Sequence, residues 1–223
     1  MNDYEALLHQ AKRLEALQEI RNLMGRYSYY RTAFQNKEMV ELWAKRDDDR
    51  LVMPFGKFVG WEAVRHCYVD LHGDRSNPAD LDELRGLMMI HLMNTEIIEV
   101  AADGKTAKGV WLSPGTETAP QTGKEKGAWC WGKYEVEFIK EDGTWKFWHM
   151  ILYPLFLSPY NRSWGQPAPE KMLGQIQLED PMCQPLDEPM WEYRMRSIHT
   201  MSRRCLIRMI IIKGYNIKGS KNT

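Results

Sequence analysis

The sequence predicts one α+β domain in which helices come first and an antiparallel, curved sheet follows. Apolar residues recur every three or four positions from Asp3 to about Phe34, which is typical of an amphipathic helix. Apolar and polar residues alternate along the first arm of the stretch from Gly127 to Trp164, which is typical of a half-buried strand, and the stretch is expected to end in an irregular, aromatic-rich exit. This order of elements favours a sheet with one face closed by helices. A chain of 223 residues, 43% hydrophobic and 27% charged, suits one globular domain with a possible appendage.

The N-terminal pattern predicts one long helix or two consecutive ones. Its apolar stripe ends in three aromatic side chains, Tyr27, Tyr30 and Phe34. Tyrosines on a buried face need hydrogen-bond partners or must face a wet cavity. The end of the helix is therefore expected to line a pocket, and ordinary core aromatics with a polar tip at the rim are the alternative.

The middle of the chain predicts short elements joined by polar loops. In order they are a helix from Glu38 to Ala44, a strand pair from Leu51 to Val59, a helix from Trp61 to about Leu71, a loop from Gly73 to Asp82, a strand from Leu87 to Val100, a strand from Thr106 to Ser113 and a loop from Gly115 to Lys126. Apolar residues on both sides of the strand carrying His91 predict burial of both faces. His66 and His72 are interpreted as surface or cap residues, and the consecutive acids at 47–49 as a solvated turn rather than a metal site.

The stretch from Gly127 to Trp164 predicts a β-hairpin whose turn lies at Glu141 to Thr144. In its second arm strict alternation places His149 on one face with Trp145, Phe147, Ile151 and Tyr153, and so toward an apolar surface. In the first arm the alternation places Trp129 and Trp131 on the face of the strand that does not carry Val136 and Phe138. Together with Trp111 they could line a site for a flat hydrophobic substrate, or they could belong to a subunit interface.

The composition changes after Trp164. Five prolines between 165 and 193 predict an extended arm that either covers the body or reaches a neighbour. A basic tail follows, for which the pattern gives no clear structure. We therefore expect a domain over 1–165 and a proline-rich arm with its tail over 166–223.

The bulk numbers exclude several classes of protein. Thirty basic and thirty acidic residues cancel, which disfavours nucleic acid or an anionic membrane as a partner. Four distant cysteines without a CxxC pair argue against a disulfide scaffold and a structural zinc site. No uncharged run approaches the ~20 residues that span a bilayer, and the first residues lack a signal-peptide profile, so a cytoplasmic location is expected. Without a Gly-rich phosphate loop, GxSxG or HExxH motif, we expect no cofactor and no metal.

Three phrases of the sequence carry a resemblance to a known family. They are GRYSYY at the end of the helix, HLMNTEIIEVAADGKTAKG from His91 to Gly109 and EDGTWKFWH from Glu141 to His149. Over about residues 10–165 the chain resembles the SnoaL-like polyketide cyclase family of the nuclear transport factor two-like superfamily. The resemblance implies a cone-shaped barrel, or cystatin-like roll, in which a curved antiparallel sheet wraps a long N-terminal helix. It also implies a deep hydrophobic pocket and a homo-oligomer, a dimer or trimer.

The resemblance also implies a kind of chemistry. In the family's dehydratases and isomerases a pocket histidine works beside tyrosines of the long helix and an aspartate. His91 falls on the strand where that histidine is expected, and Tyr27 and Tyr30 fall on the helix. The stretch SYYRTAFQNK holds no acid, so the usual carboxylate is not evident. His149 or Arg31 could supply the second polar group.

These observations predict a cofactor-independent lyase or isomerase, dehydratase-like or cyclase-like, that acts on a small cyclic or aromatic carbonyl compound. A neutral imidazole, with an unperturbed pKa near about 6.5, is suited to remove a proton beside a carbonyl group. The candidate catalytic residues are His91, Tyr27, Tyr30 and His149, and the candidate substrate-binding residues are Phe34, Trp111, Trp129 and Trp131. The alternative is a non-catalytic ligand-binding or oligomeric interaction module whose histidines are hydrogen-bonded core residues.

Overall fold

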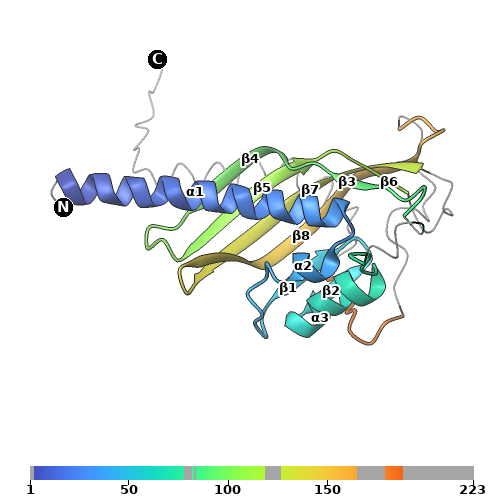
Figure 1. Cartoon of the computed structure of the whole chain (residues 1–223), viewed down its shortest axis with the longest axis horizontal. Helices are drawn as coiled ribbons and strands as arrows, with labels where there is room; N and C mark the ends of the chain where they lie inside the picture. The colour runs from blue at the N-terminus through green and yellow to red at the C-terminus, as the bar shows by residue number, and fades with distance from the viewer. Residues whose placement is uncertain (1–2, 78–81, 83, 119–126, 165–178, 188–223) are drawn as a thin grey trace, which may run out of the picture.

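The fold is a long helix laid across one face of a curved, open sheet (Figure 1). The structure, a computed structural model, describes residues 3–77, 82, 84–118, 127–164 and 179–187. The helices are α1 (Asp3–Thr32), α2 (Asn36–Val40), α3 (Trp61–Arg65) and the π-helix η1 (His66–Leu71). The strands are β1 (Arg50–Met53), β2 (Gly56–Val59), β3 (Met89–His91), β4 (Asn94–Val100), β5 (Thr106–Ser113), β6 (Gly115–Thr118), β7 (Gly127–Glu141) and β8 (Thr144–Pro159).

The sheet has eight strands, of which six follow the order β2-β1-β8-β7-β5-β4. Strand β6 pairs with β7 beyond the end of β5, and β3 pairs with β6. The expected α+β architecture is confirmed, with two differences. The β1–β8 ladder is parallel, so the sheet is mixed, and β2 and β4 remain edges, so the sheet does not close into a barrel.

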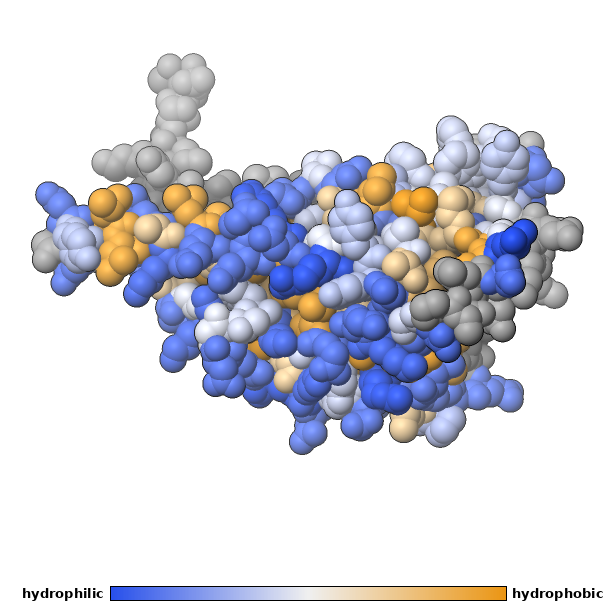
Figure 2. Space-filling model, in the orientation of Figure 1, coloured by the Kyte–Doolittle hydropathy of each residue, from blue (hydrophilic) through white to orange (hydrophobic). Residues whose placement is uncertain are grey.

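The two halves of α1 meet different surroundings. Its buried residues begin at Ala16 and include Ile20, Leu23 and Tyr27, which join the core formed with the inner face of β7 and β8. Leu7 and Leu14 in the first half are 65% and 67% exposed, and Figure 2 shows this end of the helix carrying apolar patches at the surface. None of the helices in the described segments is long and apolar enough to cross a membrane.

The strand predicted from Leu87 to Val100 is in fact two strands. Its first part, β3, pairs with β6, and its second part, β4, pairs with β5. Thr95 has a φ of 49° and the register shifts after Asn94, so one continuous ladder is broken there. Burial on both faces was also a wrong expectation, because β4 is an edge strand and Ile97 is 42% exposed.

The predicted loop from Gly115 to Lys126 begins with a strand. Residues Gly115–Thr118 form β6 between β3 and β7, and residues 119–126 lie outside the described part. This four-residue strand changes the site, because it places Glu117 beside the strand that carries His91.

The hairpin of β7 and β8 is confirmed, with its turn at Asp142 and Gly143, but its second arm does not alternate regularly. Glu137 pairs with His149, while the next residue of β7, Phe138, pairs with Phe147. Trp148 is therefore an extra residue, a β-bulge, which inverts the alternation. Beyond the bulge His149 lies on the outer face, away from α1, whereas strict alternation placed it with Phe147.

Two smaller expectations also differ from the structure. The helix expected from Glu38 to Ala44 is the shorter α2, although Trp43 is buried as predicted, at 1% exposure. The helix expected to about Leu71 changes from α-helix to π-helix at His66. Within the predicted arm, residues 179–187 lie against the body, with Gln184 bridged to Lys57 of β2. The basic tail lies outside the described residues.

Candidate functional site

The inner face of the sheet brings a histidine, a carboxylate and a thiol together from three adjacent strands. His91 ends β3, Glu117 lies on β6 and Cys130 on β7. Nε2 of His91 lies 3.7 Å from Oε2 of Glu117, an ion-pair distance when the imidazole is protonated. The Oγ of Ser28 donates to the backbone oxygen of His91 at 2.8 Å, which fixes this end of β3 to α1. We refer to His91 and Glu117 as the inner pair.

A glycine makes this approach possible. Gly115 pairs with His91 across the β3–β6 ladder and lies between it and Cys130 of β7. A Cβ atom at position 115 would be only 2.6 Å from the backbone oxygen of Cys130 and 2.7 Å from Nδ1 of His91. Because β6 has no side chain at Gly115, the imidazole of His91 can lie across β6 and approach the thiol of Cys130.

The same three side chains are the group within the described residues that could hold a metal ion. Their ligand atoms all lie within 4.8 Å of one another. Imidazole nitrogen, carboxylate oxygen and thiolate together suit Zn²⁺ with a fourth position open. Burial raises the pKa of the Cys130 thiol well above its ordinary value, so the free cysteine carries no charge at neutral pH. No sequence motif indicates this group, because its members come from separate strands.

Arg31 and His72 complete what we call the inner polar cluster, made of Arg31, His72, His91, Glu117 and Cys130. Nδ1 of His72 donates to the backbone oxygen of Cys67 at 2.6 Å, as a cap residue of η1 would. Burial first, and the charge of Arg31 second, lower the pKa of His72 to about 4, so its imidazole is neutral at pH 7. Glu117 and His91 also act electrostatically on His72, which shows that these groups share one region.

Buried tyrosines lie beside this cluster. The hydroxyls of Tyr27 and Tyr68 are 3.1 Å apart, and the ring of Tyr134 meets that of Tyr27 edge to face at 5.9 Å. Burial raises the pKa of Tyr68 and of Tyr134 well above the ordinary value, so both phenols keep their protons. Tyr27 is thus a buried part of the site region, while Tyr30 is only partly buried at the edge of the core.

His149 is not part of this cluster. On the outer face its Nδ1 lies 2.7 Å from Oε2 of Glu137, and its Nε2 lies 3.0 Å from the backbone oxygen of Asp48. The ring stacks on Trp148 with centroids 4.3 Å apart. We refer to His149 and Glu137 as the outer pair. The face predicted for His149 was wrong because the bulge at Trp148 is invisible in a regular alternation.

The predicted substrate-binding residues are scattered. Trp111 faces inward but is 1% exposed and lies over Gly109 and against Phe138, as a core residue does. Trp129 and Trp131 lie on the outer face, as their alternation predicted. There they stack on Tyr160 and Phe156, and Trp131 is 41% exposed. Phe34 follows the end of α1 with a φ of 57° and is half-buried.

Glu117, Cys130 and His72 were not predicted from the sequence as members of one site. A usable signal for Glu117 was the run of Gly115, Thr116 and Glu117 directly after Pro114, which is compatible with a short strand.

The acidic residues at 47–49 do form a turn, but Asp49 is fully buried in it, and burial raises its pKa to about 6. His66 contacts Asp70 at 3.0 Å and Asp180 at 2.8 Å near the surface.

Solved structures with the same fold include enzymes of more than one kind. A candidate scytalone dehydratase from Novosphingobium aromaticivorans is 15% identical, with a TM-score of 0.53, over 80% of this chain and 98% of its own. A hexachlorocyclohexane dehydrochlorinase, LinA-type3, from Novosphingobium barchaimii is 17% identical, with a TM-score of 0.53, over 71% of this chain and 99% of its own. An NTF2-like protein with a cystatin-like fold from N. aromaticivorans is 16% identical, with a TM-score of 0.50, over 74% and 95%. At such identities the likeness establishes the fold alone.

The sequence itself matches the SnoaL-like domain over residues 12–151, from the middle of α1 to the middle of β8. No curated protein matches the chain. The matched region holds most of α1, the whole inner polar cluster and both histidine–glutamate pairs. The chain therefore belongs to the SnoaL-like family.

Proposed function

We propose that the protein is a cofactor-independent lyase or isomerase that acts on a small cyclic or aromatic carbonyl compound. The observation that carries the proposal is the inner pair, a histidine beside a carboxylate on the face of the sheet that meets buried tyrosines. The fold is shared with a candidate scytalone dehydratase and a dehydrochlorinase, which supports a lyase-like role without naming the substrate.

In the proposed mechanism His91 is the general base. Its imidazole removes a proton from the carbon next to the carbonyl group, and the electrons of that C–H bond pass to the carbonyl oxygen as an enolate. Glu117 orients the ring and stabilises the imidazolium that forms. In an elimination the enolate then expels a hydroxyl group at the β-carbon, which takes the proton back from His91 and leaves as water. In an isomerisation the same proton returns to another carbon.

Phenol donors would lower the energy of the enolate. Tyr27 and its neighbour Tyr68 are both buried, and their hydroxyl oxygens lie 3.1 Å apart. Donors that are fixed in a dry site and aimed at developing charge often contribute the largest part of catalysis. Tyr30 remains a second candidate donor from the same helix. Glu117 thus takes the place of the acid that the helix lacks.

The experiment compares the two histidines of the sheet. Cyclic ketones carrying deuterium beside the carbonyl group are incubated with the protein in ordinary water, and the loss of deuterium is followed by mass spectrometry. Replacing His91 by alanine is expected to slow the exchange by about 10²- to 10⁴-fold. Glu117→Gln should cause a smaller loss.

His149→Ala is the matched control, and it should leave the exchange rate within a fewfold of wild type. Equal rates for wild type and His91→Ala would remove His91 from the mechanism and leave a ligand-binding module of the same fold. We also propose that the protein works in the cytoplasm as a homo-oligomer, with the outer tryptophans Trp129 and Trp131 as candidates for the subunit contact.

A further inference from the structure

Arg31 is a buried charge without a counter-ion in the described part of the chain. It lies in the last turn of α1 and is 6% exposed. Its Nη1 donates to Oδ1 of Asn36 at 2.7 Å and its Nη2 to Sδ of Met89 at 2.9 Å, while the guanidinium lies 5.1 Å from the ring centre of Tyr68. All three neighbours are neutral. Exposed Arg46, by contrast, pairs with carboxylates within 3.0 Å.

The surroundings do not cancel the charge. The positive charge of Arg31 acts on the pKa of Tyr68 and Tyr134 and helps to lower that of His72. Because His72 is neutral at pH 7, it is neither a second cation nor a counter-ion. Asn36 is itself fully buried and donates to the backbone oxygen of Gly73 at 2.6 Å, so its position is fixed by another element.

A buried cation whose direct contacts are all neutral is unfavourable, because those contacts do not replace the water that solvated it. A guanidinium has five N–H donors, and the described residues accept from two of them. One of these two acceptors is a thioether, which accepts only weakly. The planar donor fork matches the two oxygens of a carboxylate, which would supply both the charge and the acceptors that Arg31 lacks.

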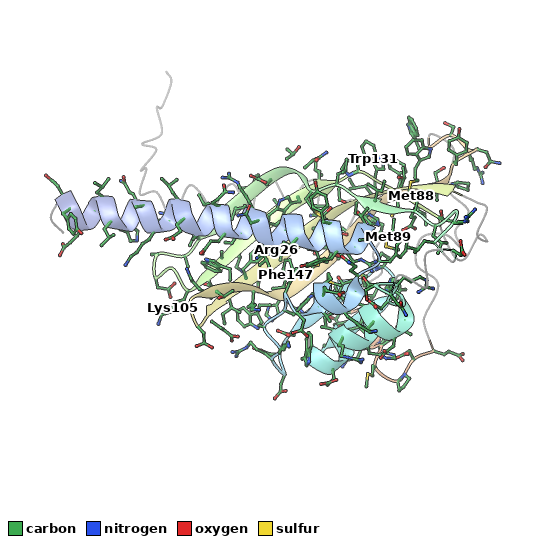
Figure 3. The ribbon with its side chains drawn as sticks, in the orientation of Figure 1. Arg26, Met88, Met89, Lys105, Trp131 and Phe147 are labelled. Atoms are coloured by element: carbon green, nitrogen blue, oxygen red, sulfur yellow. The ribbon has the colours of Figure 1, made fainter. Side chains whose placement is uncertain are left out.

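The position of Arg31 connects it with the inner pair. Met89, which accepts from Arg31, shares a strand face with His91 two residues on, a spacing of about 7 Å. In Figure 3 Met89 lies beside the C-terminal end of α1. Glu117 pairs with Met89 across the ladder, and among the described residues its carboxylate lies 3.7 Å from Nε2 of His91 and forms no ion pair with Arg31. An acid group held at Arg31 would thus place the adjoining ring of a small ligand next to the imidazole.

We propose that Arg31 binds a carboxylate group of the substrate, so that the substrates are small cyclic or aromatic carboxylic acids. The binding of such acids stands on the geometry of Arg31. That they are also substrates rests on the function proposed above.

The test measures the binding of benzoate and of benzamide, its neutral analogue, to the full chain by isothermal titration calorimetry in chloride-free buffer at pH 7. Wild type should bind benzoate about ten- to a hundredfold more tightly than benzamide, the range expected for hydrogen bonds to a charged group. Arg31→Met should remove that preference. Arg31→Lys should keep part of it, because an ammonium retains the charge but not the planar fork.

The control is Arg26→Met, on an exposed position of the same helix that Figure 3 also labels. It should keep the benzoate preference of wild type. A second measurement is thermal unfolding without ligand: Arg31→Met should melt at the wild-type temperature or above it, because a buried charge is removed. A purely structural role for Arg31 predicts a lower melting temperature and an unchanged preference in Arg31→Lys.

The proposal is overturned if wild type binds neither compound, if it binds both equally, or if Arg31→Met retains the preference. If Arg31→Met does not fold, an unchanged preference in Arg31→Lys overturns it and a reduced one supports it. These outcomes are separate from those of the exchange experiment. Loss of the benzoate preference says nothing against His91 as a base, and an inactive base leaves the benzoate titration unchanged.

Discussion

The two faces of one sheet carry the same pair of residue types in different states. In the outer pair both ring nitrogens of His149 have oxygen partners, Glu137 at 2.7 Å and the backbone of Asp48 at 3.0 Å, and Glu137 also binds Lys108. In the inner pair the carboxylate of Glu117 lies 3.7 Å from the imidazole. No hydrogen bond from the described residues occupies a ring nitrogen of His91.

The difference shows how to distinguish a structural histidine from a chemical one. A ring whose nitrogens are both held by protein oxygens gives up those bonds when it exchanges a proton, so its main effect is on stability. A ring with an open nitrogen, next to a carboxylate and to donors from other elements, can exchange a proton with a ligand. Three predictions bear on this contrast.

The largest effect on stability is expected at Gly115, because the inner pair needs a residue without a side chain at this position. Gly115→Ala brings a methyl group under 3.0 Å from two backbone oxygens and the His91 ring, so it should lower the free energy of unfolding by about 3 kcal/mol. The matched change Gly25→Ala, in α1, meets open space and should raise that free energy by about 0.5–1 kcal/mol. Urea unfolding of both variants measures this. If Gly115→Ala had the same free energy of unfolding as wild type, the three strands would have to be able to move apart at no cost.

A pH effect of about 2 kcal/mol is expected from His72. Its folded pKa of about 4 lies below the ordinary value, so the unfolded chain binds a proton first and the stability falls as the pH drops from 7 toward 4. Between pH 7 and pH 5 the loss should be about 2 kcal/mol, and His72→Gln should abolish it. Arg31, Glu117 and His91 are the groups that act electrostatically on His72, and they remain in the variant.

Urea unfolding of wild type and His72→Gln at both pH values isolates this effect. Asp49, whose pKa is raised to about 6, has the opposite sign, since it favours the folded state more as the pH falls. It is present in both proteins and cancels in the difference. If the free energies of unfolding of wild type and His72→Gln changed equally with pH, His72 would have to be solvated in the folded protein.

The smallest effect is expected from breaking the outer pair. Glu137→Gln removes the charge shared by His149 and Lys108 and should lower the free energy of unfolding by about 1 kcal/mol while leaving the deuterium exchange rate unchanged. Glu15→Gln, on the exposed part of α1, should change stability by less than about 0.5 kcal/mol. A loss of exchange activity in Glu137→Gln would erase the contrast between the two faces.

Local patterns were sufficient for the fold class and for its longest elements. The spacing of apolar residues predicted α1, and the alternation predicted β7 and the face of Trp131. His91 was chosen through the family resemblance and does lie on the inner face. Glu117 was missed because a four-residue strand has too little pattern to identify, and its partner is set by the ladders on both sides.

Arg31 shows a different limit. On a helical pattern it is one more polar residue, and only the packing of η1 and β3 shows that its charge is enclosed. His149 was misplaced because one extra residue in a strand leaves the composition of both faces plausible.

The bulge at Trp148 has a consequence for how this sheet can change during evolution. Successive side chains of a strand point to opposite faces of the sheet, and the extra residue of a bulge reverses which positions point inward. Removing that single residue would exchange the two faces of the rest of β8, moving His149 into the interior and Met150 out to the solvent. Insertions and deletions of one residue in β8 should therefore be tolerated far less often than substitutions. Each of them moves every side chain beyond it to the opposite face of the sheet.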